Sequence, residues 1–122
     1  MALILVIDDE YSIAEVLEAA LVDAGHQVVT AINGGQGLER LRERQPDLVL
    51  LDFMMPIMDG PAVLRAMKQD LQLRGIPAVV MSSLPESVVA EAAKGAYAAF
   101  LRKPFKLAAA VELITAVLNG HG

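Results

Sequence analysis

Five short runs of apolar residues occur along the chain, and longer segments of mixed polarity separate them. The runs are Leu3–Ile7, Val28–Ile32, Leu48–Leu51, Ile76–Met81 and, with smaller side chains, Ala98–Leu101. Unbroken apolar runs of this length are typical of strands that are covered on both faces. The pattern therefore predicts five buried strands.

The segments after these runs have the spacing of amphipathic helices. In the first segment the apolar residues recur at i, i+3, i+4, i+7 and i+8, namely at Ile13, Val16, Leu17, Ala20 and Leu21. Three other segments repeat the spacing in part, at Leu38 and Leu41, at Val63, Leu64, Met67 and Leu71, and at Leu107, Val111, Ile114 and Leu118. Each of these segments is predicted to place one apolar face on the sheet.

One more helix is predicted from its ends. Ser83 and Glu86 have the spacing of a capping box, and Gly95 is placed to stop the helix that they begin. Asp59-Gly60 is predicted to form the turn that starts the preceding helix. The glycine-rich segment 34–37 is expected to be a flexible turn that leads into the second helix.

Strands and helices alternate from one end of the chain to the other, so the sequence predicts an α/β fold of the (βα)5 type. Strict alternation requires right-handed crossovers and a doubly wound parallel sheet with helices on both faces. No linker, charge block or internal repeat interrupts the pattern. We therefore expect residues 1–122 to form one domain.

Composition excludes several classes of function. Of the 122 residues 55% are hydrophobic, and 10 Lys and Arg stand against 15 Asp and Glu. An acidic chain without a basic stripe is poorly suited to bind nucleic acid. No segment has the ~18 consecutive apolar residues that a transmembrane helix needs. The chain has no Cys, which excludes disulfides and thiol nucleophiles. Because the N-terminus shows no targeting pattern, we expect a cytoplasmic protein.

Chemically active residues follow directly after the predicted strands. Asp8 and Asp9 follow the first strand, Asp52 the third, Ser82 the fourth, and Lys103 lies just beyond the fifth. Ligands of parallel α/β sheets bind beyond the carboxyl ends of the strands. These side chains are therefore expected to meet at one edge of the sheet.

The residue types indicate Mg²⁺-dependent phosphoryl transfer. Three converging carboxylates raise one another's pKa unless a counter-charge balances them, which a divalent cation and Lys103 would do. A site with oxygen ligands only favours a hard cation, and Mg²⁺ fits better than Ca²⁺ because few protein ligands are available. In such a site Asp52 is a carboxylate nucleophile.

Several short motifs occur in a characteristic order. They are Asp8-Asp9, Asp52-Phe53-Met54-Met55-Pro56-Ile57-Met58-Asp59-Gly60, Ser82, Gly95-Ala96 and Phe100-Leu101-Arg102-Lys103-Pro104-Phe105. With these motifs at this spacing, the chain resembles the receiver domain of two-component response regulators over essentially its whole length. The resemblance implies a flavodoxin-like sheet with strand order 2-1-3-4-5 and a role in phosphorelay signal transduction.

The resemblance also implies a role for each site residue. Asp52 would accept a phosphoryl group from a phosphohistidine on a histidine kinase or phosphotransfer protein. Asp9, Asp52 and the backbone carbonyl of Met54 would hold Mg²⁺, and Asp8 would act mainly through bound water. Lys103 would contact the phosphoryl oxygens, and the Lys103-Pro104 peptide is expected to be cis. Such a domain catalyses only its own phosphorylation and dephosphorylation, so we do not class it as an enzyme.

A switch and an output surface are implied in the same way. Ser82 would move toward the phosphoryl group, and Phe100 would turn into the space that Ser82 leaves. Met54 and Leu84 would tune the lifetime of the phosphorylated state by limiting the access of water. The downstream protein target, and a phosphorylation-dependent homodimer, would use helix four, strand five and helix five, within Glu86–Leu118. Among the charged positions of that surface, Lys94, Arg102 and Lys106 are the first to test.

Three other functions are weighed against this one. A phosphohydrolase similar to the haloacid dehalogenase family needs a second Asp two residues after the nucleophile, where this chain has Met54. A pseudo-receiver that only binds partners would have lost site residues, yet all five are present. Flavin binding is disfavoured because no Ser/Thr-rich phosphate loop follows the first strand. His26 and His121 are expected to be solvated, since neither has a helical setting suited to a phosphorylated histidine.

Overall fold

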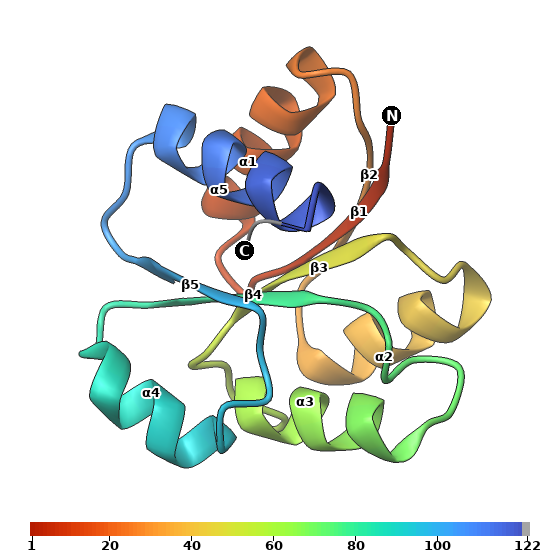
Figure 1. The fold of residues 1–122 in the computed structure, drawn as a ribbon, viewed down its shortest axis with the longest axis vertical. Helices are drawn as coiled ribbons and strands as arrows, with labels where there is room; N and C mark the ends of the chain where they lie inside the picture. The colour runs from red at the N-terminus through yellow and green to blue at the C-terminus, as the bar shows by residue number, and fades with distance from the viewer. Residues whose placement is uncertain (121–122) are drawn as a thin grey trace.

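Five strands and five helices alternate along the chain in the predicted order (Figure 1). The computed structural model describes residues 1–120. The strands are β1 (Leu3–Ile7), β2 (Gln27–Ala31), β3 (Leu48–Asp52), β4 (Ala78–Ser82) and β5 (Ala99–Arg102). The helices are α1 (Tyr11–Asp23), α2 (Gly34–Glu43), α3 (Gly60–Gln69), α4 (Glu86–Ala93) and α5 (Leu107–Leu118). The predicted (βα)5 architecture is confirmed.

The strands form one parallel sheet in the order β2-β1-β3-β4-β5. In Figure 1, α1 and α5 cover one face of the sheet, and α2, α3 and α4 cover the other. This is the flavodoxin-like arrangement that the resemblance to receiver domains implies. The direction of winding reverses between β1 and β3, and a doubly wound sheet binds its ligands beyond the strand ends at such a point.

Alternate residues of the central strands enter two separate cores. The core beneath α1 and α5 contains Ile4, Val6, Leu50 and Met81 from the sheet. The core beneath α2, α3 and α4 contains Leu5, Ile7, Leu51 and Val80. Every residue of β3 and β4 is buried, and each large apolar side chain so placed contributes about 1.5–3 kcal/mol. The many apolar residues of the chain therefore fill the two cores on either side of the sheet. Within residues 1–120, no helix is long and apolar enough to cross a bilayer.

Some apolar positions that the sequence assigns to the core are exposed. Val16 on α1 is 46% exposed, and Ile32, just after the end of β2, is 53% exposed. Helix α3 ends at Gln69, so Leu71 is 76% exposed and the turn that follows buries Leu73 in its place. These errors concern the margins and ends of elements, where apolar spacing alone does not define the packed face.

The prediction of a flexible turn at residues 34–37 is wrong, because these residues form the first turn of α2. Asn33 caps this helix, and its Oδ1 accepts a hydrogen bond from the backbone N–H of Gln36 at 2.7 Å. Gly37 lies directly against the side chain of Ile7, and a Cβ at this position would collide with it. Glycine is therefore needed here for the close approach of α2 to β1.

The capping box predicted at Ser83 and Glu86 is also wrong. Pro85 is the N-cap of α4 and makes no side-chain capping bond. The nearby hydroxyl that does accept a backbone hydrogen bond is that of Ser82, from the N–H of Leu84 at 3.0 Å. The chain leaves α4 through two residues in the left-handed region, Lys94 (φ 52°) and the Gly95 that the sequence predicts as the stop (φ 69°).

Candidate functional site

Three carboxylates meet at the carboxyl edge of the sheet, beside the reversal point. Strands β1 and β3 are neighbours with Ile7 opposite Leu51, so Asp8 and Asp52 extend from the same level of the sheet. Each of Asp8, Asp9 and Asp52 offers a carboxylate oxygen within 4.8 Å of the others. The fold therefore brings together acidic residues that are far apart in the sequence.

A single lysine lies between the two buried carboxylates. The Nζ of Lys103 donates to Asp8 Oδ2 at 3.2 Å and to Asp52 Oδ1 at 3.4 Å. Asp8 is fully buried and Asp52 is 5% exposed, whereas Asp9 is exposed. The Lys103-Pro104 peptide that leads away from the site is cis, as the resemblance predicts. Two buried carboxyl groups thus share one ammonium group.

This environment shifts the ionisation of Asp52 and Lys103. Burial, and next the charge of Asp8, raise the pKa of Asp52 from 3.8 to about 7, although Lys103 opposes the shift. Burial disfavours the charge of Lys103, yet Asp52 and Asp8 together raise the pKa of its ammonium above the ordinary value. Lys103 therefore stays protonated. Its single positive charge does not fully balance Asp52 and Asp8 when both are ionised.

The donor set fits a divalent cation. Three carboxylates and one ammonium leave two uncompensated negative charges when all of them are ionised. The converging donors are oxygens, with no His or Cys among the clustered ligands. Hard cations that prefer oxygen bind such sites, and Mg²⁺ accepts one or two carboxylates and keeps several waters. The cluster is therefore able to hold Mg²⁺ at the edge of the sheet.

The loop after β3 shapes the approach to Asp52. Met54, two residues after Asp52, is 59% exposed, while the next residue, Met55, is buried. Ile57 is fully exposed and has a φ of 71°, a conformation that β-branched residues rarely adopt. Asp59 ends the loop as the N-cap of α3. The loop therefore presents apolar side chains beside the carboxylates.

Gly60 holds this loop in place by a close backbone approach, since its N–H donates to the carbonyl oxygen of Phe53 at 2.9 Å. A Cβ on Gly60 would lie 2.8 Å from Phe53 Cα and 3.0 Å from the carbonyl oxygen of Asp52. Gly60→Ala is therefore expected to lower the free energy of unfolding by about 1–2 kcal/mol, because backbone atoms must shift to relieve the contact.

Gly75→Ala is the matched control for this prediction, because a Cβ on Gly75 would meet no atom within 4 Å. Urea unfolding of both variants measures the difference. Equal stability of the two variants would contradict the close-approach argument.

The structure places the remaining predicted site residues on β4 and β5. Ser82 ends β4 and is 2% exposed, one residue beyond Met81, which lies opposite Asp52 in the register. Phe100 lies opposite Val80, is half-buried, and packs with Leu84 against the core beneath α4. Ser82 is thus adjacent to the carboxylates in the sheet, and Phe100 lies further down the neighbouring strand.

Two polar contacts differ from what the sequence indicates. Glu10 is not among the site residues predicted from the sequence, although its Oε1 lies 4.0 Å from Lys103 Nζ. The position of Glu10 directly after Asp8 and Asp9 is the sequence feature that could have indicated this contact. His26, expected to be solvated, is half-buried, and its Nδ1 accepts the backbone N–H of Ala2 at 3.2 Å. His121 lies outside the described residues. The contacts of Glu10 and His26 leave the cluster of Asp8, Asp9 and Asp52 as predicted.

The sequence motifs and this geometry agree with one protein family. Residues 4–115 match the sequence profile of the response regulator receiver domain. The chain belongs to the response regulator receiver family. Receivers are modules of two-component signalling that interact with histidine kinases and downstream targets, and they are not classical enzymes. Mg²⁺ is typical of the family, and the carboxylate cluster of this receiver could bind such a metal.

The receiver is similar to proteins of the same length. It is 37% identical over 118 residues to the chemotaxis protein CheY of Bacillus subtilis, covering 95% of this chain and 97% of CheY. It is 34% identical over 121 residues to the protein PilH of Pseudomonas aeruginosa, covering 98% of this chain and 100% of PilH. The structure of the Vibrio cholerae chemotaxis protein CheY4 superposes with a TM-score of 0.90 at 26% identity, covering 96% and 98% of the two chains.

Other relatives are longer. The receiver is 37% identical over 118 residues to the transcriptional regulator NtrC of Escherichia coli, which covers 95% of this chain but 24% of NtrC. It spans 51% of the transcriptional regulatory protein PrrA of Mycobacterium tuberculosis, at 36% identity. The receiver therefore corresponds to one part of these regulators.

Proposed function

We propose that residues 1–122 form one receiver whose Asp52 accepts a phosphoryl group in a Mg²⁺-dependent reaction. The observation that carries this proposal is the contact of Lys103 with both buried carboxylates, Asp8 at 3.2 Å and Asp52 at 3.4 Å. A nucleophilic carboxylate, a fixed cation and oxygen donors for a hard metal are the parts that phosphoryl transfer requires.

The phosphodonor that we propose is a phosphohistidine on a histidine kinase or phosphotransfer protein. An Asp52 carboxylate oxygen attacks the phosphorus, a P–O bond forms, and the P–N bond to the imidazole breaks. The imidazole nitrogen leaves with the bonding electron pair and takes a proton from water. Lys103 contacts the phosphoryl oxygens, which carry the negative charge of the transition state.

Asp9, Asp52 and the backbone carbonyl of Met54 would hold Mg²⁺, with Asp8 acting mainly through bound water. The metal would supply the positive charge that this site lacks when all three carboxylates are ionised. Asp8 keeps Lys103 protonated and fixed beside Asp52 through their 3.2 Å hydrogen bond. The same proposal places the protein in the cytoplasm, where phosphodonors and Mg²⁺ are available.

Phosphorylation would then change a surface. Ser82 would reorient its hydroxyl, which now accepts the N–H of Leu84, toward the phosphoryl group, and Phe100 would turn inward. Because Phe100 lies on β5 and packs against the core beneath α4, its movement would reach β5 and α4, which with α5 form the proposed output surface. This surface, with Lys94, Arg102 and Lys106, would bind the downstream target or a second phosphorylated copy.

The test of the metal-dependent step uses phosphoramidate, a small phosphodonor with the P–N bond of phosphohistidine. Intact-mass spectrometry should show the gain of one phosphoryl group in the presence of Mg²⁺ and no gain after chelation with EDTA. Phosphorylation at the same rate with and without EDTA would contradict the proposed role of the metal.

The lifetime of the phosphorylated state provides a further prediction. Met54 and Leu84 line one hollow beside the loop after β3, and neither side chain can orient a water molecule by hydrogen bonding. The double variant Met54→Asn and Leu84→Glu is therefore expected to lose its phosphoryl group several-fold faster than the wild type. Decay of the phosphorylated protein, followed by intact mass after removal of the donor, measures this. A variant that decays at the wild-type rate or more slowly would contradict it.

A further inference from the structure

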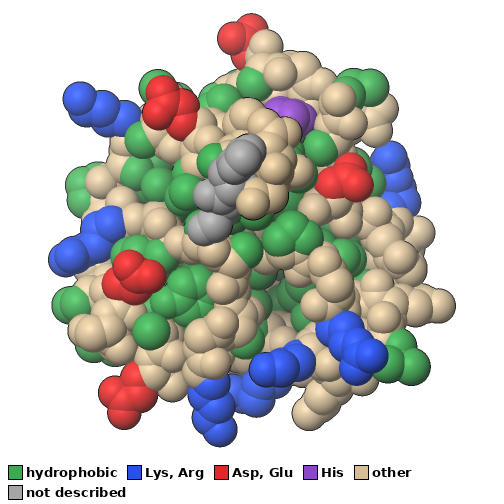
Figure 2. Space-filling model, in the orientation of Figure 1, with side chains coloured by type: hydrophobic (Ala, Val, Ile, Leu, Met, Phe, Trp, Pro, Cys, Tyr) green, Lys and Arg blue, Asp and Glu red, His purple; other side chains and the backbone are tan. Residues whose placement is uncertain are grey.

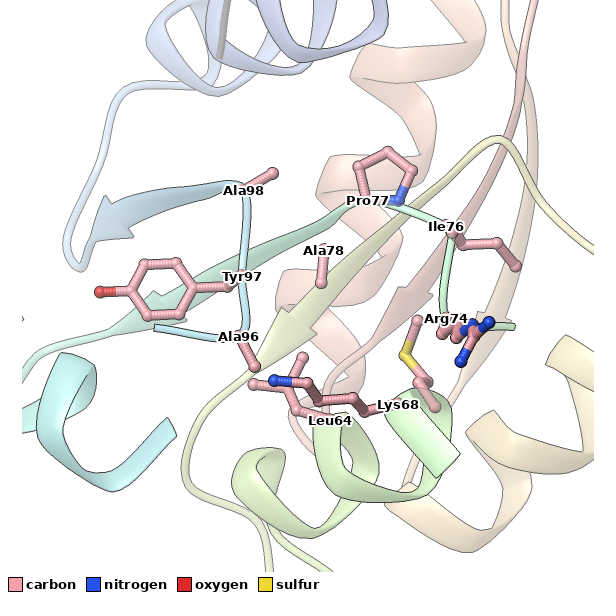
Figure 3. Close-up of a pocket in the computed structure, with 11 residues that line it drawn as sticks. Leu64, Lys68, Arg74, Ile76, Pro77, Ala78, Ala96, Tyr97 and Ala98 are labelled. Carbon is pink, nitrogen blue, oxygen red and sulfur yellow. The ribbon is translucent and has the colours of Figure 1, made fainter. Parts of the chain in front are cut away.

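A cavity lies at the end of the sheet opposite to the carboxylate cluster. It has a volume of about 260 Å³ and is bounded by α3, by the segment that leads into β4, and by the link between α4 and β5 (Figure 3). Strand β4 begins at this cavity with Ala78 and ends at the site with Ser82, roughly 13 Å away along the strand. The residues that line the cavity are all distinct from those of the site.

The cavity combines an apolar floor with a basic rim. Apolar lining residues include Leu64, Ile76 and Ala96. In Figure 3, Lys68 extends from α3 along the cavity and Arg74 lies at its other side. The ring of Tyr97 forms part of the wall with its hydroxyl pointing away, and this hydroxyl donates to Glu86 at 3.4 Å.

The charge of the rim is opposite to that of the chain. The two charged residues that line the cavity, Lys68 and Arg74, are both basic, whereas the chain carries a net charge of −5. Both side chains are exposed, and neither forms an ion pair within residues 1–120. In Figure 2 this face shows a hollow with Lys and Arg side chains gathered below it. An anionic ligand is therefore favoured over a cationic or neutral one.

We propose that this cavity binds an acidic peptide segment of a protein partner. One apolar side chain of the segment would fill the floor, and its neighbouring carboxylates would face Lys68 and Arg74. Exposed ion pairs contribute little by themselves, so the bound molecule needs an apolar anchor as well as negative charge. The cavity is smaller than those that enclose most small-molecule ligands, which favours a single anchored side chain. This site requires no phosphorylation of Asp52 and goes beyond the proposed function.

The first test is a titration of the whole ¹⁵N-labelled chain with a synthetic peptide that has a central leucine between glutamates. The expected result is a shift of the amide signals of Gly75, Ala96 and Ala98, which border the cavity. A peptide with glutamine in place of each glutamate, and one with glycine in place of leucine, should both bind much more weakly. Equal binding of either control peptide would overturn the proposal, as would the absence of shifts at these amides.

The second test compares variants. Lys68→Glu combined with Arg74→Glu is expected to weaken binding of the acidic peptide about tenfold at low salt, because two attractive charges become repulsive. Arg65→Glu, an exposed position on α3 outside the cavity lining, should change the affinity less than about twofold. Equal loss in both variants would overturn the assigned position of the ligand.

Two controls identify other occupants. If inorganic phosphate alone reproduces the shifts at the same concentration, the cavity is a site for free anions and the peptide proposal is overturned. If the same amides shift with protein concentration in the absence of peptide, the occupant is a second copy of the chain, which would also overturn it.

Discussion

Lys103→Met is expected to slow phosphorylation of Asp52 by phosphoramidate about 100-fold at saturating Mg²⁺. The substitution keeps an unbranched side chain of similar length but removes the ammonium that lies 3.4 Å from Asp52 Oδ1 and 3.2 Å from Asp8 Oδ2. The charge on the transferring phosphoryl group would then lose its fixed protein cation, and a loss of this size is typical when one such donor is removed. Initial rates from intact mass provide the measurement.

Two further variants separate the loss of charge from general damage. Arg65→Met removes an exposed cation from α3 and should leave the rate unchanged. Lys103→Arg keeps the charge with a bulkier head group, so its rate should lie between those of the wild type and Lys103→Met. Thermal unfolding in Mg²⁺ checks that each variant is folded. A folded Lys103→Met variant that reacts at the wild-type rate would exclude a direct role for this lysine.

Asp52→Asn is expected to stabilise the metal-free protein at neutral and alkaline pH. Burial and the charge of Asp8 raise the pKa of Asp52 from 3.8 to about 7, so ionisation of this group is less favourable in the folded chain than in the unfolded chain. A shift of this size corresponds to at most about 4 kcal/mol. We expect a gain on the order of 2 kcal/mol, because the carboxylates can relax in the folded site.

The sign of the pH dependence follows from the same shift. Well below pH 3.8 both states are protonated at Asp52, and the group does not reduce the stability of the fold. As the pH rises from about 4 to about 7, the folded state retains a proton that the unfolded state has lost, so the wild type loses stability relative to Asp52→Asn. Above about pH 7 the difference in the free energy of unfolding between the wild type and Asp52→Asn should stay constant.

Urea unfolding of both proteins between pH 4 and pH 8 measures this difference. Saturating Mg²⁺ should stabilise the wild type more than the variant, because the ion binds the folded carboxylates and the variant lacks one of them. A metal-free variant that is less stable than the wild type at pH 8 would show that the contact between Asp52 and Lys103 outweighs burial and repulsion.

The sheet and the carboxylate cluster could be predicted from the sequence because both follow from patterns that are visible in short segments of the chain. Continuous apolar runs identify strands that are buried on both faces, as in β3 and β4, where every residue is buried. Alternation of strands and helices then brings the residues after β1, β3 and β5 to one edge, which is where Asp8, Asp52 and Lys103 meet.

Features that depend on local packing could not be predicted. The glycines at the start of α2 resemble a flexible turn, but Gly37 is required by its contact with Ile7, a residue thirty positions earlier in the sequence. Ser83 and Glu86 have capping spacing, but no side-chain cap forms at Pro85. The basic cavity has no motif at all, because Lys68, Arg74 and Tyr97 come from three separate segments.

We propose Asp52 as the phosphoacceptor of this receiver. The most direct test of this proposal is the intact mass of the wild type and of Asp52→Asn after incubation with phosphoramidate and Mg²⁺. We expect the wild type to gain one phosphoryl group and Asp52→Asn to gain none. A wild type that gains no phosphoryl group, or an Asp52→Asn protein that gains one equally well, would contradict it.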